Sequence, residues 1–413
     1  MNNTIPFQYQ CYACGHVTKV AEAYHCPKCD DPMALSAMGV MTPDEMKATP
    51  RSLWHYAALL PITDNKNIVS LGEGATPLLE ASTLAEKWGI KELRIKNETV
   101  NPTGSFKDRQ LSVSISHAKE TGRDTVAVVS SGNVAVATSA YAAHAGMKAV
   151  LFMHGQAGAG KIAQAATYGA QVICVDSPRP SEVFELCIKA CDAFGWAHLS
   201  TSGMHNPYNV EGAKTIAYEL YQQYGNDMPD WIVAPVGGGG LLGGIWRGLL
   251  DLQRMGFIET LPRLAGVQAS GCAPLKRALG ENWSFQESLK HPWQNPETIA
   301  GGIADDILFD GHTALPAIRT SNGAALAVDD DAIRKGVQTL AHAEGLLCEL
   351  TTAVVIAALE QNTELFRNQS VVCILTGHGL KDLAGKPIKD SMAPPHIPPE
   401  LKALERLPAI QGY

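Results

Sequence analysis

"NPTGSFKDR", residues 101–109, places Lys107 in a turn of small polar residues between two segments of different character. The preceding "ELRIKNETV" (92–100) reads as a strand, and the residues after the turn have the periodicity of a helix. A lysine in such a turn is most often a solvated surface charge. A chemical role for Lys107 therefore depends on what the rest of the chain brings to the same place.

Short β-branched runs alternate with longer helix-like stretches along most of the chain. The predicted strands are "ELRIKNETV", "DTVAVVSS", "KAVLFMH", "AQVICVD", "DWIVAPV", "RLAGVQAS" and "SVVCILTG". This alternation indicates a parallel α/β fold, in which ligands bind beyond the carboxyl ends of the strands. We therefore look for chemistry in the turns that follow strands.

Three further turns of this kind carry residues suited to binding. Gly237–Gly240 removes side chains at the start of a helix, where backbone amides and the helix dipole can meet a phosphate. The loop lacks the Lys-Ser/Thr of a P-loop, which disfavours a nucleoside triphosphate. Ser130, Ser131 and Asn133 begin an alanine-rich helix, where hydroxyls and free amides could bind a carboxylate. Thr376 ends an apolar strand, so that its hydroxyl would lie at the carboxyl edge of the sheet. The alternative to a binding role is a flexible turn for the glycine loop and an ordinary helix cap for Ser130 to Asn133.

Four of the ten cysteines form a CxxC–x11–CxxC pattern near the N-terminus, and they are Cys11, Cys14, Cys26 and Cys29. This spacing is typical of a zinc ribbon, in which four thiolates complete a tetrahedral shell and leave no position for a catalytic water. Two disulfides are the alternative, although nothing places the chain in an oxidising compartment. We expect a structural zinc, and we expect the remaining six cysteines to be core thiols.

Length and charge exclude several classes of protein. The chain has 413 residues, 46% of them hydrophobic and 18% charged, which is ordinary for a globular protein. The 33 basic and 41 acidic residues give a net charge of −8, and no basic stripe favours nucleic acid. The N-terminus has no signal sequence, and no apolar run is long enough to cross a membrane. We therefore expect a cytoplasmic protein that binds neither nucleic acid nor membrane.

The lysine turn and the three other turns together resemble the threonine synthase branch of the fold type II pyridoxal-phosphate enzymes. The resemblance covers most of residues 70–382. It rests on "LGEGATPLL", "KNETVNPTGSFKDR", "SSGNVAVATSAYAAHAG", "NPYNVEGAKTIAYEL", "PVGGGG", "GVQASGCAPL", "AEGLLCEL" and "TGHGLKD". Many members of this branch also carry a short N-terminal zinc ribbon, in agreement with the cysteine spacing.

The resemblance implies a role for each turn. Lys107 would bind pyridoxal phosphate covalently and then move protons as acid and base. Phe106 would line the cofactor ring, Asn133 would hydrogen-bond its 3′-oxygen, Thr376 would meet its pyridine nitrogen, and Gly237–Gly240 would hold its phosphate. The expected substrate-binding residues, chosen for their hydroxyls, amides or positive charge near these positions, are Thr103, Ser105, Arg109, Ser130 and Ser131.

The implied fold is α/β, a tryptophan synthase β-like fold type II enzyme with two open α/β domains and a small N-terminal zinc ribbon. We expect the ribbon within residues 1–45 and the catalytic region within 46–413. A smaller α/β subdomain is expected at roughly 108–205, with the remainder of the catalytic region forming the larger one. The substrate would be a small amino acid, and the resemblance further implies a homodimer.

Two departures from the threonine synthase pattern keep the substrate open. Such enzymes tend to have asparagines in the glycine loop and a basic residue before the "EG" of the "NP…EG" stretch. Here these positions are Gly238, Leu241 and Asn209. The preferred hypothesis is conversion of O-phospho-L-homoserine to L-threonine. The alternatives are β-elimination from a serine- or threonine-like amino acid, and a catalytically silent protein that uses its ribbon to bind a partner.

Overall fold

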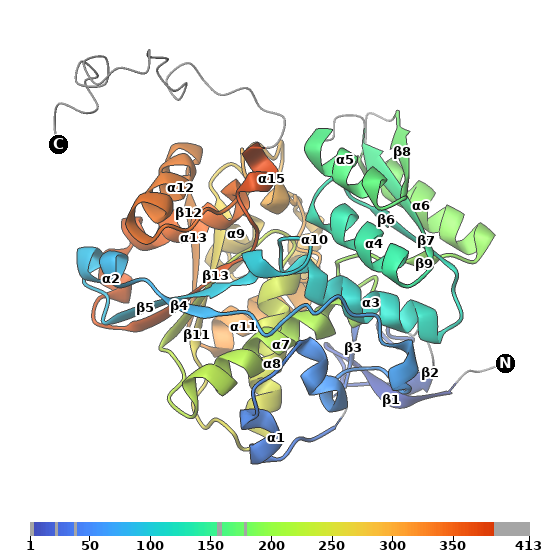
Figure 1. The fold of residues 1–413 in the computed structure, drawn as a ribbon, viewed down its shortest axis with the longest axis horizontal. Coiled ribbons are helices and arrows are strands. Elements are labelled where there is room, and N and C mark those ends of the chain that lie inside the picture. Colours follow the sequence, from blue (N-terminus) through green and yellow to red (C-terminus); the bar gives the residue numbers. More distant parts are fainter. Residues whose placement is uncertain (1–3, 21–23, 37–38, 155–158, 177–179, 384–413) are drawn as a thin grey trace, which may run out of the picture. The chain divides into compact units, whose positions relative to one another are not determined.

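The computed structural model describes residues 4–20, 24–36, 39–154, 159–176 and 180–383, which form one compact unit up to Asp382 (Figure 1). All seven strands predicted from the sequence are present among them. The strands are arranged in three separate sheets. The fold is the α/β architecture expected of a fold type II enzyme, with a small N-terminal sheet added.

The N-terminal sheet is antiparallel and has the order β2-β1-β3. Its strands are β1 (Thr4–Cys11), β2 (Val17–Val20) and β3 (Met33–Leu35). The following segment forms α1 (Pro43–Lys47) and the 3₁₀ helices η1 (Leu53–Leu59) and η2 (Asn65–Asn67). Thr42 caps α1 through a capping box with Glu45, which satisfies amides that would otherwise be unpaired.

The largest sheet has six strands in the order β12-β11-β10-β13-β5-β4, and only β4 runs antiparallel to its neighbour. The strands are β4 (Leu78–Glu80), β5 (Glu92–Asn97), β10 (Trp231–Pro235), β11 (Arg263–Ala269), β12 (Ala324–Val328) and β13 (Ser370–Leu375). Its main helices are α2 (Ser82–Trp88), α7 (Pro207–Tyr224), α8 (Gly240–Arg254), α9 (Pro274–Gly280), α11 (Gly311–Thr320), α12 (Asp330–Glu344) and α13 (Leu350–Gln361). Shorter elements are η3 (Glu98–Val100), α10 (Phe285–Lys290), η4 (Gly301–Ile303), α14 (Thr363–Phe366) and α15 (Leu380–Leu383).

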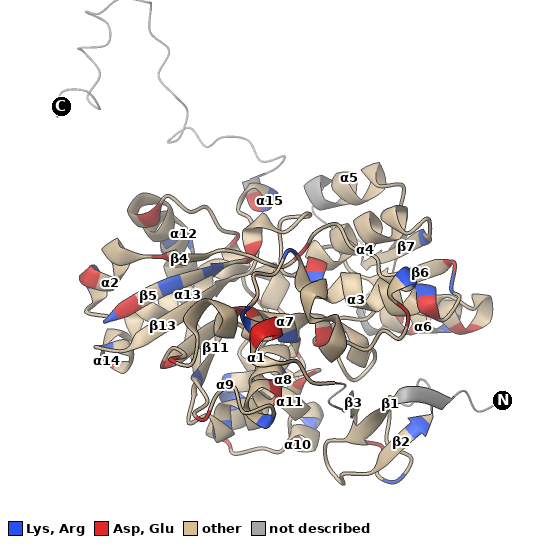
Figure 2. Ribbon diagram, turned by 60° about the horizontal axis from the view of Figure 1, so that its bottom comes forward, with Lys and Arg blue, Asp and Glu red and all other residues tan. Residues whose placement is uncertain are grey.

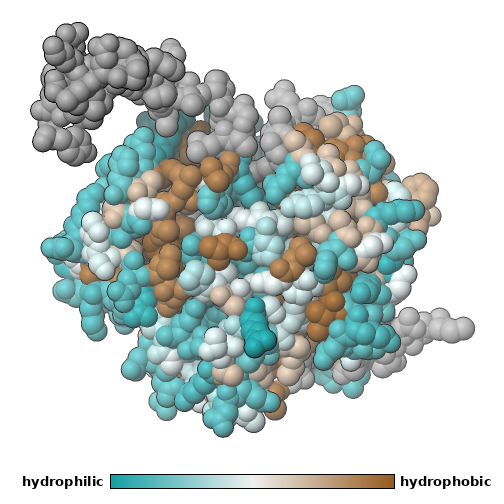
Figure 3. Space-filling view, viewed as in Figure 1, coloured by the Kyte–Doolittle hydropathy of each residue, from teal (hydrophilic) through white to brown (hydrophobic). Residues whose placement is uncertain are grey.

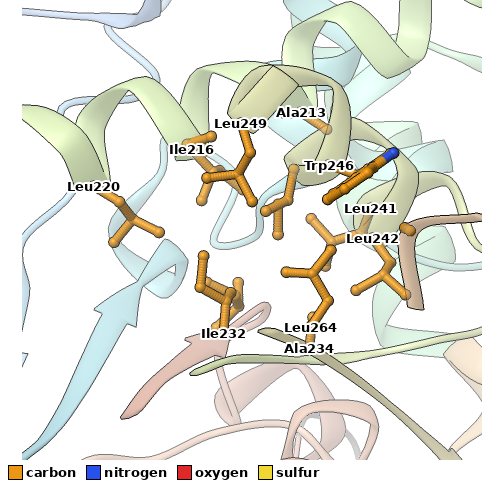
Figure 4. Packing of buried hydrophobic residues seen from close by; sticks show 14 of the residues in the cluster. Ala213, Ile216, Leu220, Ile232, Ala234, Leu241, Leu242, Trp246, Leu249 and Leu264 are labelled. Carbon is orange, nitrogen blue, oxygen red and sulfur yellow. The ribbon is translucent and has the colours of Figure 1, made fainter. Parts of the chain in front are cut away.

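Alternate residues of the central strands pack against helices on opposite faces of this sheet. On β10, Ile232 and Ala234 join the core formed with α7, α8, α9 and α11 (Figure 4). Trp231 and Val233 join the core formed with α2, α12 and α13. Burial on both faces explains why these strands read as continuous hydrophobic runs rather than alternating ones.

A second, smaller sheet has four parallel strands in the order β8-β7-β6-β9. Its strands are β6 (Thr125–Val129), β7 (Lys148–His154), β8 (Gln171–Val175) and β9 (Ala197–His198). The helices α3 (Lys107–Glu120) and α4 (Asn133–His144) pack on one face, and α6 (Pro180–Phe194) packs on the other. The remaining helix of this region is α5 (Ala159–Thr167).

Charged residues of both signs are spread over the described part of the chain. Among these residues, acidic and basic ones are interspersed along the ribbon and form no stripe of Lys and Arg in this view (Figure 2). Hydrophobic residues on the face in Figure 3 form separate patches between hydrophilic ones. Within the part of the chain that the structure describes, no helix combines the length and apolar character needed to span a membrane.

Candidate active site

Three neighbouring strands of the large sheet bring the lysine turn, Thr376 and the glycine loop to one edge. The strands β10, β13 and β5 are adjacent and parallel, so their carboxyl ends point the same way. β10 leads into Gly237–Gly240, β13 ends directly before Thr376, and β5 leads through η3 to Lys107. Residues far apart in the sequence therefore meet at the place where parallel sheets bind ligands.

Backbone hydrogen bonds fasten the lysine turn to the Thr376 turn. The Phe106 amide donates to the Thr376 carbonyl over 3.0 Å, and the His378 amide donates to the Gly104 carbonyl over 3.0 Å. Within the lysine turn, the amide and hydroxyl of Thr103 donate to the Asp108 carboxylate over 2.8 and 2.7 Å. This pairing fixes the turn, and it leaves the Thr103 hydroxyl engaged by protein rather than by substrate.

Lys107 is the first residue of α3, and its amine lies beside Phe106 and Gln110. Its Nζ is 4.5 Å from the centre of the Phe106 ring and donates to Gln110 Oε1 over 2.9 Å. Burial lowers the Lys107 pKa to about 8, although the carboxylates of Asp305, Asp310 and Glu349 act in the opposite direction. With this pKa, about a tenth of the amine is uncharged at pH 7, far more than for an ordinary lysine, and a nucleophilic lysine must react in the uncharged form.

Asn133, at the start of α4, faces this turn from the smaller sheet. Its Nδ2 donates to both carboxylate oxygens of the buried Glu349 over 2.9 and 3.0 Å. Its Oδ1 accepts from Lys381 Nζ over 2.9 Å. The Ser130 hydroxyl accepts from the Gly132 amide over 3.1 Å, while Ser131 is exposed. Asn133 is thus held by Glu349 at the start of α13 and by Lys381 of α15, and it connects the smaller sheet to the region around the large sheet.

Thr376 and Ser105 place two buried hydroxyls on the same side of the lysine turn. The Thr376 hydroxyl lies 2.7 Å from the Thr352 hydroxyl of α13. Ser105 forms an isolated bridge with Gly377, and its Oγ is buried with no hydrogen-bond partner among the described residues. An unpaired buried hydroxyl is costly, so this group is suited to a polar ligand.

The glycine loop is shaped to receive an anion. Gly239 has a φ of +105°, which only glycine adopts without strain, and a Cβ at Gly237 would lie 2.5 Å from Asp305 Oδ2. The Gly238 amide donates to Asp305 Oδ2 over 2.6 Å. A carboxylate thus occupies an amide of the loop that a cofactor phosphate would use. The loop, the amine of Lys107 and the hydroxyl of Thr376 together fit pyridoxal phosphate.

Two acidic residues flank this loop. Asp310 Oδ1 accepts from the Gly203 amide over 2.6 Å, and a Cβ at Gly240 would lie 3.0 Å from Asp310 Oδ2. Burial raises the pKa of Asp310 to about 7 and raises that of Asp305 as well. Both groups therefore bind a proton more readily than an exposed aspartate, which lowers the negative charge that a phosphate would meet.

Arg109 does not take the role expected from the sequence. Its side chain is fully buried, and its guanidinium pairs with Glu98 over 2.7 Å and with Glu219 over 2.5 Å. It also donates to the hydroxyls of Thr215 and Thr76 over 2.9 and 3.1 Å. With its donors engaged by these groups, Arg109 has no face for a substrate phosphate. The expectation that it binds substrate is corrected to a structural role at the base of α3.

Sequence reasoning missed two residues near Lys107, Gln110 and Asp305, and it left the place of a third, Glu349, open. Gln110 lies one helical turn after Lys107, a spacing at which side chains meet. The sequence leaves Glu349 either near the cofactor or on a helix surface, and the structure shows it to be 3% exposed. Asp305 follows a loop with no recognisable motif, and no signal in the sequence connects it to the glycines.

The four N-terminal cysteines come together as the spacing predicts. Their sulfur atoms all lie within 4.8 Å of one another, with Cys11 and Cys29 at 3.5 Å and Cys14 and Cys26 at 3.6 Å. A tetrahedral zinc with Zn–S bonds of about 2.3 Å would separate its sulfurs by about 3.8 Å. The donor set and its dimensions therefore fit a structural Zn²⁺.

A lysine at the carboxyl edge of a parallel sheet, opposite a glycine loop and an asparagine from a second sheet, defines a fold type II pyridoxal-phosphate enzyme. Residues 69–377 match the family described as "Pyridoxal-phosphate dependent enzyme", and the chain belongs to this family. The family membership confirms the resemblance inferred from the sequence.

Similar proteins of known name within this family include threonine synthases, and similar solved structures include a threonine deaminase and a serine racemase. The chain is 35% identical to a threonine synthase of Methanocaldococcus jannaschii over 96% of this chain and 98% of that protein. It is 37% identical to a threonine synthase of Mycobacterium tuberculosis over 79% of this chain and 87% of that protein. Among solved structures, a threonine deaminase from "T.th." matches with a TM-score of 0.63 and 27% identity, covering 73% of this chain and 92% of that one. Maize serine racemase, at 22% identity and a TM-score of 0.63 over 74% of this chain and 88% of that one, shares the fold.

Proposed function

We propose that this protein is a pyridoxal-phosphate-dependent threonine synthase that converts O-phospho-L-homoserine and water to L-threonine and phosphate. The observation that carries the proposal is the 35% identity to a threonine synthase over 96% of this chain and 98% of that protein. The likeness therefore extends over nearly the whole length of both chains. A half-buried amine with a pKa lowered to about 8 at the sheet edge supplies the required acid–base group.

In the proposed reaction, one residue transfers protons and the others hold the cofactor. When bound, pyridoxal phosphate withdraws electrons from the substrate and acidifies the protons at Cα and Cβ. Lys107 is placed to accept and return these protons, because its lowered pKa lets the amine gain and lose a proton near neutral pH. Phosphate leaves from Cγ, Cγ gains one proton in its place, and Cβ gives up one proton and takes the hydroxyl of water, so that the C–O bond broken and the C–O bond formed lie on neighbouring carbons. Asn133 and Thr376 hold the ring, and Gly237–Gly240 holds the phosphate of the cofactor.

The substrate contacts remain a proposal for Ser105, Ser130 and Ser131. The buried Ser105 Oγ without a hydrogen-bond partner supports the assignment of Ser105. The position of Ser130 and Ser131 just before α4 supports the assignment of these two serines. Asn209, which stands where a basic residue is usual, is fully buried, and its side-chain amide finds no partner among the residues that the structure describes. We expect this amide to contribute neutral hydrogen bonds to the substrate.

One experiment tests the assignment. Pure holoenzyme is incubated separately with O-phospho-L-homoserine, L-threonine and L-serine, and released phosphate and 2-oxo acid are measured. Phosphate release with formation of L-threonine from the first substrate supports the synthase. Release of 2-oxobutyrate from L-threonine, with no phosphate from O-phospho-L-homoserine, would mean that the protein is a dehydratase and not a threonine synthase.

The dehydratase is the second candidate because of two specific features. The loop of four glycines at 237–240 resembles that of serine and threonine dehydratases, and Asn209 removes a positive charge expected to bind a phosphorylated substrate. The 27% identity to a solved threonine deaminase supports the same alternative. We further propose a structural Zn²⁺ at the four N-terminal cysteines, a cytoplasmic location and a homodimer.

A further inference from the structure

Both cysteine knuckles of the N-terminal ribbon present a ring next to their first cysteine. Tyr12 follows Cys11, and its ring meets that of His312 edge-on, with centroids 4.6 Å apart and planes at 62°. His25 precedes Cys26, and its ring centroid lies 6.4 Å from that of His205. The two knuckles therefore contact two different segments of the catalytic region, the start of α11 and the turn after β9.

These two segments meet at Asp310. Asp310 precedes α11 and lies two residues before His312, and its Oδ1 accepts from the Gly203 amide of the turn after β9 over 2.6 Å. Its own amide donates to the Gly238 carbonyl over 2.7 Å. Asp310 thus joins both segments contacted by the ribbon to the loop that would hold the cofactor phosphate.

Arg247 forms a second connection between the ribbon and this loop. It lies on α8, the helix that the glycine loop begins, and its Nη1 donates to the Tyr12 hydroxyl over 2.8 Å. Its Nη2 donates to the Leu35 carbonyl of β3 and pairs with Glu211 over 2.6 Å. The ribbon therefore contacts α8, which follows the glycine loop in the chain, and α11, whose preceding residue Asp310 donates to the loop.

We propose that the ribbon positions the glycine loop, so that metal at the four cysteines and affinity for pyridoxal phosphate are thermodynamically coupled. Metal ligation by Cys11 and Cys14 fixes the tight turn that contains Tyr12. Without the metal, the turn is less ordered, and Tyr12 no longer restrains His312 and Arg247. The loop must then be ordered when the phosphate binds, which lowers the affinity. The coupling rests on the proposed cofactor and not on the choice of substrate.

The first test compares cofactor affinity with and without zinc. Apoenzyme freed of pyridoxal phosphate is prepared with zinc and after chelation, and the dissociation constant for pyridoxal phosphate is measured by fluorescence titration. Far-ultraviolet circular dichroism verifies that both forms are folded. We expect about tenfold weaker binding without zinc, within the usual range of coupling between sites. Equal affinities would overturn the coupling, whereas no binding by the zinc-loaded protein would overturn the cofactor assignment itself.

The second test is a double-mutant cycle that keeps the metal in place. Tyr12→Ala and His312→Ala each remove one side of the ring contact, and metal analysis verifies that the four cysteines still bind zinc. Each variant should weaken binding of pyridoxal phosphate several-fold, and the double variant should bind no more weakly than Tyr12→Ala, which already removes both the ring contact and the bond to Arg247. Arg254→Ala is the matched control, because Arg254 donates to the ribbon carbonyl of Gly39 over 3.0 Å but lies at the end of α8 away from the glycine loop. Wild-type affinity in zinc-loaded Tyr12→Ala, or fully additive effects, would contradict the proposal.

Discussion

Lys107 must react with an aldehyde at neutral pH, and an ordinary lysine is almost fully charged there. Burial at the start of α3 lowers its pKa to about 8, and the adjacent Phe106 ring limits access of water to one side of the amine. Lys96 and Lys214 are also buried, but they form ion pairs with Glu219 and Glu211 over 2.7 and 2.6 Å. The surroundings of Lys107 thus differ from those of a structural lysine.

Replacement of this amine tests the central assignment. Lys107→Ala should abolish turnover and the visible absorption of the bound cofactor, because the bond to pyridoxal phosphate needs a primary amine. Borohydride reduction of the wild-type holoenzyme followed by peptide mapping should place the pyridoxyl group on Lys107. Its recovery on another lysine would refute the assignment.

The lowered pKa of Lys107 gives a prediction on pH. Only the uncharged amine reacts with an acylating reagent, so labelling of Lys107 in apoenzyme should be half-maximal near pH 8, and labelling of exposed lysines near pH 10.5. Gln110 Oε1 accepts from the ammonium and stabilises the charged form. Gln110→Leu should therefore move the midpoint for Lys107 to a lower pH. Mass spectrometry resolves each site, and an unchanged midpoint in Gln110→Leu would show that Gln110 has no influence on the amine.

Arg109 gives a prediction on stability rather than on substrate affinity. Its charge lies between Glu98 and Glu219, and all three side chains are fully buried. Arg109→Met leaves two buried carboxylates without this partner, which costs about 3–5 kcal/mol of unfolding free energy. Urea denaturation measures the loss. A Michaelis constant that rises while stability stays unchanged would restore the substrate role inferred from the sequence.

At the scale of elements, the site depends on strand order. The sequence predicted seven strands and the turns after them, because each strand is a short β-branched run with glycine or polar residues at its end. It did not predict that β10, β13 and β5 are neighbours, which follows from pairing between segments far apart in the chain. The strands β4 and β9 were also missed, since runs as brief as Ala197–His198 carry no periodicity. The strand β12 was missed as well, because its sequence "AALAV" is rich in alanine, which is not typical of strands.

The residues found without motifs lie on elements that reach the site from elsewhere. Glu349 is the N-cap residue of α13, but its side chain makes no hydrogen bond to that helix. Its carboxylate instead accepts a hydrogen bond from Asn133, which lies next to the smaller sheet. Asp305 approaches the glycine loop from the segment between η4 and α11. Motif resemblance predicted roles for Lys107, Asn133, Gly237–Gly240 and Thr376, because adjacent residues specify the local surroundings of each. Contacts made through tertiary packing have no such local pattern.

Asp305 leads to a prediction about the glycine loop. Its carboxylate accepts from the Gly238 amide, so a phosphate must displace it before using that donor. Asp305→Ala should strengthen binding of inorganic phosphate to apoenzyme several-fold, as measured by calorimetry. Asp306→Ala is the control, because it removes the same charge one residue away and leaves the Asp305 bond to Gly238 in place. Equal effects of the two substitutions would mean that net charge, rather than the bond to Gly238, determines the affinity.

At the scale of the whole molecule, the ribbon and the catalytic region share one hydrophobic cluster. Phe7, Tyr9 and Leu35 of the ribbon pack with residues of the catalytic region, among them Val113 and Tyr208. The hydroxyls of Tyr9 and Tyr208 lie 2.9 Å apart. The sequence predicted the ribbon as a separate module, because the cysteine pattern is local and says nothing about what the sheet packs against. In the structure, the cluster continues across the expected boundary at residue 45.

This shared cluster predicts how the protein responds to loss of metal. Zinc that binds the folded ribbon but not the unfolded chain stabilises folding by mass action. Because Cys11 and Cys26 belong to the same cluster as Tyr208, chelation should lower one cooperative unfolding transition of the whole molecule rather than release the ribbon alone. Differential scanning calorimetry with and without chelator measures this, and Cys11→Ser should reproduce the chelated curve. Metal analysis should give about one zinc per chain in protein purified without chelator. Two transitions, of which only the lower one depends on zinc, would mean that the ribbon folds independently of the catalytic region.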